Sequence, residues 1–390
     1  MYKILTLNKI SNKGLTLLPK EDYCISNEED NPDAILARSY QMHEMTFPKS
    51  LKAIARAGAG VNNIPLQRCS DEGIVVFNTP GANANAVKEL VICSLFLASR
   101  EIIKGVGWAK VLKGEDSEIE LLVEKNKSRF AGSEIKGKTL GVIGLGAIGA
   151  LVAKDALSLG MNVIGFDPYL SVDAAWELSN KVKKASSLEY LLKKSDFLTI
   201  HVPLLPSTKQ MYNEELFNKM KNGIKIMNFS RGELFNDEDL ISALDKNQVS
   251  AYVTDFPNST LISHEKVIAI PHLGASTKES EENCAIFAAS SLKEFLESGN
   301  ITNSVNFPNA KLEMKPNLKR ISIINKNVPN KIGEVTSILA NYGLNIEDML
   351  NQSKGEVSYM LLDIDGEISN EVIEKLKGLN DIVRVRLVGG

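Results

Sequence analysis

The residue spacing best suited to chemistry is the glycine-rich turn Gly144-Leu-Gly146-Ala-Ile-Gly149, which follows the β-branched run TLGVI and opens a helical stretch. In such a turn the first glycine permits the tight bend, and the second lets the backbone approach a pyrophosphate. The third allows close packing of helix against strand. The N–H groups at the helix N-terminus favour the anionic group. The pattern therefore predicts a dinucleotide site in preference to an ordinary glycine-rich turn.

An acidic residue indicates which dinucleotide is bound. Asp167 ends the next predicted strand, 21 residues after Gly146. A carboxylate at that place accepts a hydrogen bond from the ribose 2′-hydroxyl and repels a 2′-phosphate. The sequence therefore favours NAD over NADP.

Two further residues with reactive side chains follow predicted strands: Arg231 in NFSRGE and His272 in IPHLGAST. Open α/β sheets bind ligands at the carboxyl ends of their strands. A guanidinium suits a carboxylate or a polarised carbonyl, and a histidine can take a hydroxyl proton while hydride leaves the same carbon. Each residue taken alone also fits a surface arginine or a packed histidine. His201, in HVPL, has the same ambiguity and is given no proton-transfer role.

The elements that must position these residues alternate between short apolar runs and longer helical stretches, which predicts a parallel α/β architecture. A first series has strands at 4–7, 34–37, 53–57 and 74–77 and a buried helix at 85–100. A second series of six strands begins at Thr139, and a long helix is expected at 276–297. Residues 321–388 then follow the order βαββαβ, which is a ferredoxin-like module.

Composition excludes several classes of protein. A length of 390 residues predicts two or three domains. A net charge of −3 argues against a nucleic-acid binder, and no apolar run reaches the length of a membrane span. The four cysteines contain no CxxC pair, so we expect buried thiols in a reducing, cytoplasmic setting. The four histidines include no HExxH pair, so a metal site is not expected.

Seven segments in the same order make the sequence similar to the NAD-dependent D-isomer-specific 2-hydroxyacid dehydrogenases. They are RAGAGVNNIPL, NTPGANANAVKEL, GKTLGVIGLGAIG, HVPL, NFSRGELFN, DFP and IPHLGAST. The tail NVPNKIGEVTSILANYGLNI resembles an ACT regulatory module. The resemblance implies two Rossmann-like lobes, with the NAD lobe at 96–274 inserted into a split substrate lobe at 1–95 and 275–305. A linker at 306–317 and an ACT module at 318–390 would follow.

The resemblance also implies roles for individual residues. Arg231 would hold the substrate carboxylate and C2 oxygen, and His272 would be the general base. The cofactor would contact Gly144, Gly146, Ala147, Ile148, Gly149, Asp167, Phe229, Ser230, Asp255 and Gly274. The substrate would contact Ser39, Arg56, Gly58 and Asn83. The substrate implied is a phosphorylated 2-hydroxy acid that gives its hydride to NAD. Lys127 and Arg129 are candidates for its phosphate, with a solvated charge run as the alternative.

Two alternatives stay open: a dehydrogenase for another D-2-hydroxy acid, and a non-catalytic NAD-sensing protein on the same fold. One departure bears on them, because the family pairs its histidine with an acid shortly after the DxF segment. Here Ser259 and Thr260 stand at that place. A hydroxyl supplies no charge to stabilise an imidazolium. Glu265 or Asp255 could take the role of that acid.

In the tail, Asn327 and Asn345 match ACT positions that bind a small amino acid across a dimer interface, and Asn325 stands beside them. The resemblance therefore implies an L-serine effector, with a purely dimerising module as the alternative. It also implies a homo-oligomer, either a dimer or a tetramer.

Overall fold

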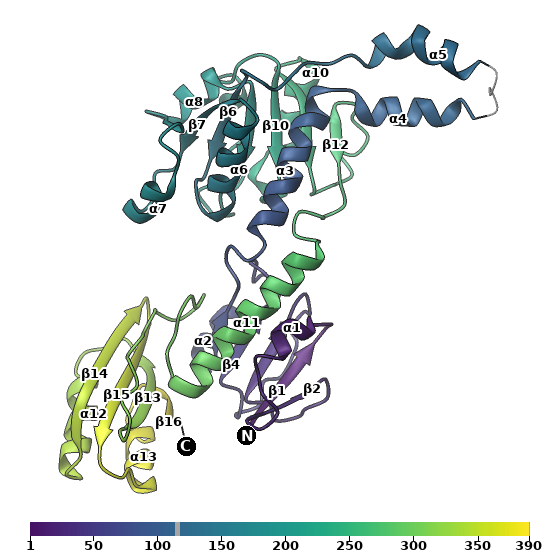
Figure 1. Ribbon diagram of the computed structural model, residues 1–390. Coiled ribbons are helices and arrows are strands. Elements are labelled where there is room, and N and C mark those ends of the chain that lie inside the picture. Colours follow the sequence, from purple (N-terminus) through teal and green to yellow (C-terminus); the bar gives the residue numbers. More distant parts are fainter. Residues whose placement is uncertain (114–117, 390) are drawn as a thin grey trace. The chain divides into compact units, whose positions relative to one another are not determined.

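The computed structural model describes residues 1–113 and 118–389, which form two compact units. The first unit combines Met1–Asn83 with the chain from Lys278 onward, and the second is Ala84–Thr277. The expected division at residue 95 falls inside helix α3 (Ala84–Ser99), which packs against α6 (Ala147–Ser158) within the second unit (Figure 1).

The first unit is built on a five-stranded parallel sheet in the order β2-β1-β3-β4-β5. Its strands are β1 (Tyr2–Leu7), β2 (Tyr23–Ser26), β3 (Ala34–Ala37), β4 (Ala53–Arg56) and β5 (Val75–Phe77). The helices α1 (Asn12–Leu15), α2 (Leu66–Asp71) and the long α11 (Lys278–Ser298) accompany it. Four strands were predicted here. The fifth, β2, is a partly exposed edge strand of sequence YCIS, so it lacks the continuous apolar run that marks a buried strand.

The second unit contains a seven-stranded parallel sheet in the order β12-β11-β10-β9-β6-β7-β8. The strands are β6 (Thr139–Ile143), β7 (Asn162–Phe166), β8 (Lys183–Lys184), β9 (Phe197–Ile200), β10 (Ile224–Asn228), β11 (Val249–Thr254) and β12 (Val267–Ala269). The direction of winding reverses between β6 and β9, which is where doubly wound sheets bind dinucleotides. Besides α3 and α6, the helices are α4 (Ile102–Val111), α5 (Ile119–Asn126), η1 (Lys127–Phe130), α7 (Val172–Glu177), α8 (Leu188–Lys194), α9 (Glu214–Phe217), η2 (Gly232–Leu234) and α10 (Asp237–Asp245).

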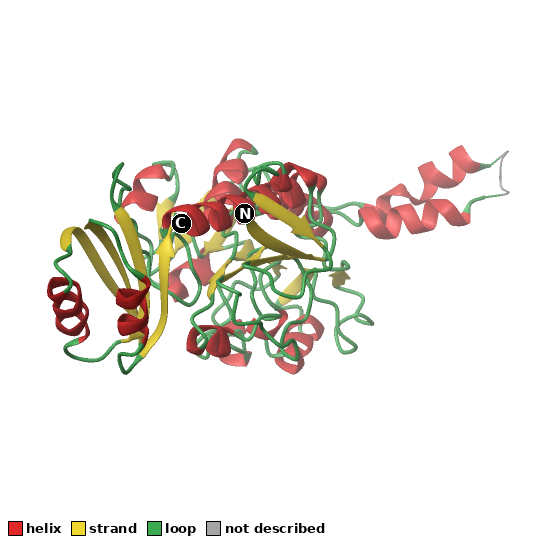
Figure 2. Cartoon of the chain, turned by 90° about the horizontal axis from the view of Figure 1, so that it is seen from below, coloured by secondary structure: helices red, strands yellow, loops and turns green. Residues whose placement is uncertain are grey.

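The C-terminal module confirms the predicted βαββαβ order. It comprises β13 (Lys319–Lys326), α12 (Lys331–Asn341), β14 (Asn345–Lys354), β15 (Val357–Asp365), α13 (Asn370–Lys377) and β16 (Ile382–Val388), with its antiparallel sheet in the order β14-β15-β13-β16. Figure 2 shows both helices on one side of this sheet. The other side shares a core with the five-stranded sheet, in which Ile324, Tyr359 and Leu361 pack with Phe295 of α11.

Three side chains of this module bind the carbonyl groups at the end of α11. Arg386 Nη2 donates to Phe295 O (2.7 Å), Arg320 Nη1 to Ser298 O (2.9 Å), and the Tyr359 hydroxyl to Gly299 O (2.6 Å). The last carbonyls of a helix lack partners within the helix, and cations are favourable at that end. The module therefore acts as a C-cap for α11.

Two expectations drawn from composition can be compared with the structure. Cys69 and Cys284 are buried, but Cys24 and Cys93 are exposed, so the expectation that the four thiols are buried is wrong for two of them. Cys24 lies on the edge strand β2 and Cys93 on α3. None of the helices within residues 1–113 and 118–389 has the length and hydropathy needed to cross a membrane.

Candidate active site

Three neighbouring strands of the second unit place the predicted reactive residues at one edge of the sheet. Arg231 follows β10, Asp255 follows β11 directly, and His272 follows β12. These strands are adjacent and parallel, with β11 in the middle. Side chains separated by some forty residues in sequence thus come to one edge because the carboxyl ends of parallel strands align.

The glycine turn after β6 fits a dinucleotide. Gly144 has φ +84°, and a Cβ there would lie 2.5 Å from His201 O. A Cβ on Gly149 would lie 1.9 Å from Gly144 O, so the helix packs directly on the turn. At Gly146 the space that a Cβ would occupy is open, which leaves room for a pyrophosphate. Gly146 also precedes α6, whose first residues are Ala147 and Ile148, so unpaired N–H groups point from the helix start.

A pocket of about 790 Å³ continues from this turn along the end of β7. Asp167 lies in its lining and is fixed by two backbone bonds, from Leu145 N to Oδ2 (2.9 Å) and from Tyr169 N to Oδ1 (2.9 Å). Val172, Ala175 and Trp176 of α7 also line this pocket. The glycine turn, the acid and the pocket together can hold the adenosine half of NAD.

Comparison with known proteins identifies the family. Residues 101–274 match the model of the D-isomer specific 2-hydroxyacid dehydrogenase NAD binding domain. D-3-phosphoglycerate dehydrogenase of Haemophilus influenzae is 31% identical over 340 residues, which are 84% of this chain and 79% of that protein. The chain belongs to the D-isomer-specific 2-hydroxyacid dehydrogenases. NAD is accordingly its cofactor.

Other members of this dehydrogenase family extend the match. D-3-phosphoglycerate dehydrogenase 1 of Saccharomyces cerevisiae is 28% identical over 99% of this chain and 87% of its own length. The structure of NAD+-bound 3-phosphoglycerate dehydrogenase of Entamoeba histolytica aligns with a TM-score of 0.62 and 27% identity, covering 78% of this chain and 98% of that one.

The loop that carries Arg231 is held by Asn228, the first residue of the NFSRGE segment, for which no role was predicted. Asn228 Nδ2 donates to Arg231 O (2.9 Å) and to the Tyr252 hydroxyl (3.0 Å), while its Oδ1 accepts from Ser230 N (3.1 Å). The Ser230 hydroxyl donates to Ile200 O (2.6 Å), and Phe229 is buried. The sequence signal that could have indicated this role is a polar residue at the end of an apolar strand, because a buried amide needs hydrogen-bond partners close by. The exposed Arg231 side chain therefore leaves from a rigid turn.

Asp255 is the buried charged residue of this edge, with 1% of its surface exposed. Its Oδ2 accepts from Gly274 N (2.8 Å), and its Oδ1 has no hydrogen-bond partner among the described residues. Burial raises the pKa of Asp255, whereas the Gly274 N–H and the charges of His272 and Arg231 act in the opposite direction. The electrostatics of this carboxylate are therefore linked to both predicted catalytic groups.

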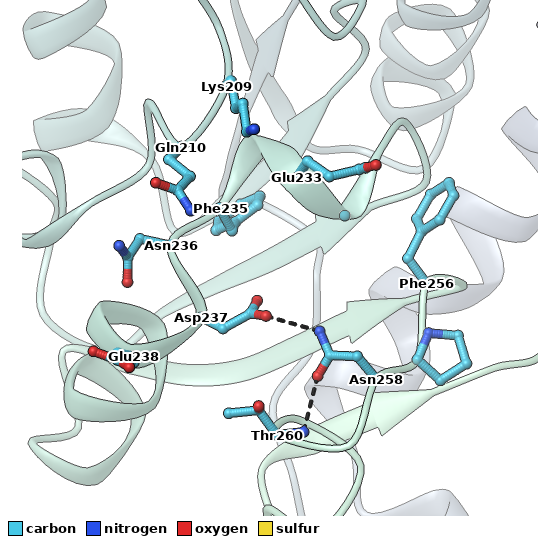
Figure 3. A pocket seen from close by; sticks show the side chains of 12 residues that line it. Lys209, Gln210, Glu233, Phe235, Asn236, Asp237, Glu238, Phe256, Asn258 and Thr260 are labelled. Atoms are coloured by element: carbon cyan, nitrogen blue, oxygen red, sulfur yellow. Dashed lines mark hydrogen bonds between the residues drawn. The ribbon is translucent and has the colours of Figure 1, made fainter. Parts of the chain in front are cut away.

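The surroundings of His272 include an aromatic ring from the turn that follows Asp255. The imidazole packs against the ring of Phe256, with centroids 4.9 Å apart. Phe256 also lines a separate hollow of about 590 Å³, which Figure 3 shows together with Asn258 and Thr260. There Asn258 donates to Asp237 Oδ2 (2.8 Å) and accepts from Thr260 N (3.1 Å), so this short turn is tied to the start of α10.

Glu265 lies before β12, whereas His272 follows it. With a rise of about 3.3 Å per residue, the strand separates these two residues by more than a carboxylate can reach. Glu265 is also exposed. Of the two alternatives for the missing acid, Glu265 is therefore not placed to reach His272. Asp255, on the neighbouring strand, is the better-placed carboxylate.

His201 follows β9 and bonds through Nε2 to the Thr199 hydroxyl (2.9 Å). Burial lowers the pKa of His201 to about 3, so its ring is neutral near pH 7. The backbone N–H of His201 donates to Ile143 O (2.8 Å), directly before the glycine turn, and the neutral ring is assigned no part in proton transfer.

The predicted substrate residues gather at the carboxyl edge of the sheet in the first unit. Ser39 follows β3, and its N–H donates to Asn8 Oδ1 (3.0 Å). Arg56 ends β4, and its Nε donates to Arg38 O (2.9 Å). Gly58 and Asn83 lie after β4 and β5 respectively. The same edge rule therefore operates in both sheets.

The candidates for contact with a substrate phosphate lie on a short helix of the second unit. Lys127 and Arg129 lie on η1, where Lys127 pairs with Glu124 and Arg129 Nη1 donates to Asn126 Oδ1 (3.4 Å). Nothing in their surroundings distinguishes them from a solvated charge run. A role at a substrate phosphate remains a prediction.

The three asparagines of the C-terminal module do not converge within one chain. Asn325 Nδ2 donates to Lys326 O (2.7 Å), and Asn327 Nδ2 donates to Gly355 O (3.1 Å). Asn327 Oδ1 accepts from Ser353 near the end of β14, but Asn345 begins that strand. Eight residues of strand place Asn345 roughly 27 Å from Ser353, the residue that binds Asn327.

Proposed function

We propose that this dehydrogenase oxidises 3-phospho-D-glycerate to 3-phosphooxypyruvate with NAD, the first step of L-serine biosynthesis. The proposal depends on one observation: three adjacent strands, in the sheet that also carries the dinucleotide turn, are followed by Arg231, Asp255 and His272. The relatives named D-3-phosphoglycerate dehydrogenase, which match over most of this chain, support the choice of substrate.

The roles of the residues follow from their chemistry. Arg231 binds the substrate carboxylate and polarises the C2 oxygen, since its planar fork suits bidentate contact. His272 takes the C2 hydroxyl proton. NAD, when bound at the glycine turn and Asp167, would supply the acceptor for the hydride of C2.

We propose that Asp255 replaces the missing acid as the positioning residue for His272. It is buried, one of its oxygens has no hydrogen-bond partner among the described residues, and the charge of His272 acts against the rise that burial causes in its pKa. A nearby carboxylate stabilises the imidazolium that forms when the proton is taken. Its bond to Gly274 N ties it to the segment that carries His272.

The test is a comparison of substrates in the direction of NADH oxidation. We expect 3-phosphohydroxypyruvate to be reduced with a kcat/KM at least about 100-fold above that of pyruvate or hydroxypyruvate, because the phosphate supplies binding energy. Faster turnover of a non-phosphorylated acid would contradict the proposed substrate. No turnover with any of them, together with tight NADH binding, would favour an NAD-sensing protein.

His272→Asn is the matched control for that assay. It removes the base and leaves the glycine turn and Asp167 intact. Turnover should fall by about 100-fold or more while NADH affinity stays unchanged. A variant that keeps full turnover would contradict the role of His272.

We infer that the protein is a homo-oligomer that associates through α4 and α5. Neither helix has a buried residue, and large apolar side chains on them are exposed: Ile102, Ile103, Val106, Val111, Leu121 and Val123. A contiguous exposed apolar surface is typical of an interaction site. Light scattering of Ile103→Glu with Val106→Glu should give a smaller species than the parent protein, and an unchanged mass would contradict the inference.

We further propose L-serine as an effector of the C-terminal module. Because Asn327 and Asn345 are at opposite ends of β14, a site using both requires a second copy of the module. Serine should depress turnover, and Asn345→Ala should abolish that sensitivity while leaving basal turnover intact. Serine sensitivity that persists in this variant would contradict the assignment.

A further inference from the structure

Helix α7 exposes an apolar face. Val172 and Trp176 are four residues apart, which places them on the same side of the helix. Their side chains are 73% and 84% exposed, and both line the 790 Å³ pocket beside the glycine turn. A single exposed apolar residue is ordinary, but an exposed indole that lines a pocket indicates a ligand.

The same pocket is lined by Leu145 of the glycine turn and by Asp167. In NAD-dependent members of this fold, an acid at the end of the second strand binds the adenosine ribose, and Asp167 occupies that place here. In NAD the adenine is attached to that ribose, on the side away from the pyrophosphate. The base is flat and aromatic, so its faces favour an apolar partner, and Val172 and Trp176 of α7 are among the apolar residues of this lining.

We propose that the Trp176 indole stacks on the adenine of NAD and sets cofactor affinity without a part in hydride transfer. The proposal rests on NAD binding and not on which acid is oxidised. In the sheet, β7 is separated from β10 by β6 and β9. Three strand spacings of about 4.8 Å therefore separate this strand from the one before Arg231.

The chain offers two matched controls. Tyr169 is 91% exposed and close to Trp176 in sequence, but it is not among the described residues that line the pocket. Its contact with Asp167 uses the backbone N–H, so Tyr169→Ala keeps that bond. Trp108, the second tryptophan, packs on Phe130 at 5.4 Å, and Trp108→Phe leaves Trp176 as the sole indole.

The experiment measures dissociation constants for AMP, for nicotinamide mononucleotide and for NADH. Trp176→Ala should weaken AMP and NADH by a similar factor, on the order of 10-fold, because base–aromatic stacking is lost. Nicotinamide mononucleotide should bind unchanged. Trp176→Phe should lie between the parent and the alanine variant, and Tyr169→Ala should match the parent.

Two further readouts separate stacking from a general effect on the lobe. In the Trp108→Phe background, AMP should quench the emission of Trp176 because the adenine stacks on the indole. AMP does not absorb at the emission wavelength, so a loss of emission is not caused by reabsorption. In turnover, Trp176→Ala should raise the KM for NAD with kcat unchanged, which is the signature of lost uniform binding.

Unchanged AMP affinity in Trp176→Ala would overturn the proposal, as would an equal loss for nicotinamide mononucleotide. Because Trp176 is exposed, its replacement removes no core packing. AMP binding is measured without an acid substrate, so an error in the proposed substrate leaves this test intact.

Discussion

Two carboxylates are equally buried in this protein but differ in how completely they are hydrogen-bonded. Asp363 in the C-terminal module and Asp255 in the NAD-binding unit are each 1% exposed. Asp363 accepts from Arg320 Nε (2.6 Å) and Nη2 (2.7 Å), and the other three donors of that arginine bind backbone carbonyls, those of Ser298, Leu312 and Glu313. Within the described part of the chain, Asp255 accepts a bond from Gly274 N through one oxygen, and its other oxygen has no hydrogen-bond partner. A buried ion pair whose hydrogen bonds are all made serves structure. A buried carboxylate with an unused oxygen has a perturbed pKa, which is typical of functional sites.

The largest effect should come from breaking the buried ion pair. Arg320→Met leaves the Asp363 carboxylate buried without a partner and removes a cap from α11. We expect the free energy of unfolding of the first unit to fall by about 3–5 kcal/mol. Urea denaturation followed by circular dichroism measures it, with NADH binding as a check that the second unit is intact.

The double variant Arg320→Met with Asp363→Leu is the control for that measurement. Removing both charges should recover part of the loss, because no unpaired charge remains. If the double variant is as unstable as the single one, the loss arises from packing and not from the orphaned charge.

The second effect concerns activity and sharpens the contrast. Asp255→Asn keeps an acceptor for Gly274 N and removes the charge near His272. We expect kcat/KM to fall by on the order of 10- to 100-fold while the free energy of unfolding is unchanged or higher. Asp22→Asn, at an exposed position, is the control that should alter neither. A loss of stability without a loss of turnover in Asp255→Asn would show that Asp255, like Asp363, has a structural role.

A smaller effect concerns the pH dependence of stability. Because the folded-state pKa of Asp255 is raised by burial, the folded protein holds this proton more tightly than the unfolded chain. The contribution of Asp255 to stability therefore falls as pH rises through the range above about 4. The free energy of unfolding of Asp255→Asn relative to the parent should increase between about pH 4 and pH 6. A difference that stays constant with pH would show that the carboxyl does not titrate on unfolding.

The smallest effect tests one hydrogen bond of the cap. Tyr359→Phe removes the buried bond to Gly299 O and should cost about 1 kcal/mol. Tyr342→Phe removes an exposed bond to Glu371 and should cost less. Equal costs in the two variants would mean that burial does not strengthen the cap.

Much of this arrangement follows from the sequence. The runs ending at Asn228 and Thr254 are largely buried apolar segments and the run ending at Ala269 is half-buried, so their carboxyl ends and the residues that follow them are predictable. The docking of the module on α11 is not, since the donors and carbonyls involved are 22 to 91 residues apart and follow no local pattern. Likewise, the exposure of Trp176 depends on the turn between β7 and α7, which periodicity does not report.

The cap on α11 also fixes an order of events during synthesis. The chain of the second unit, Ala84–Thr277, emerges whole before α11 is made, whereas the first unit is divided around it. The partners of Ser298, Gly299 and Phe295 arrive 22, 60 and 91 residues later, the last of them from the final strand. Domains generally fold as units on the ribosome as they emerge. The NAD-binding unit, although it lies in the middle of the chain, is therefore the first to be complete, whereas the cap on α11 is complete only when Arg386 of β16 has emerged.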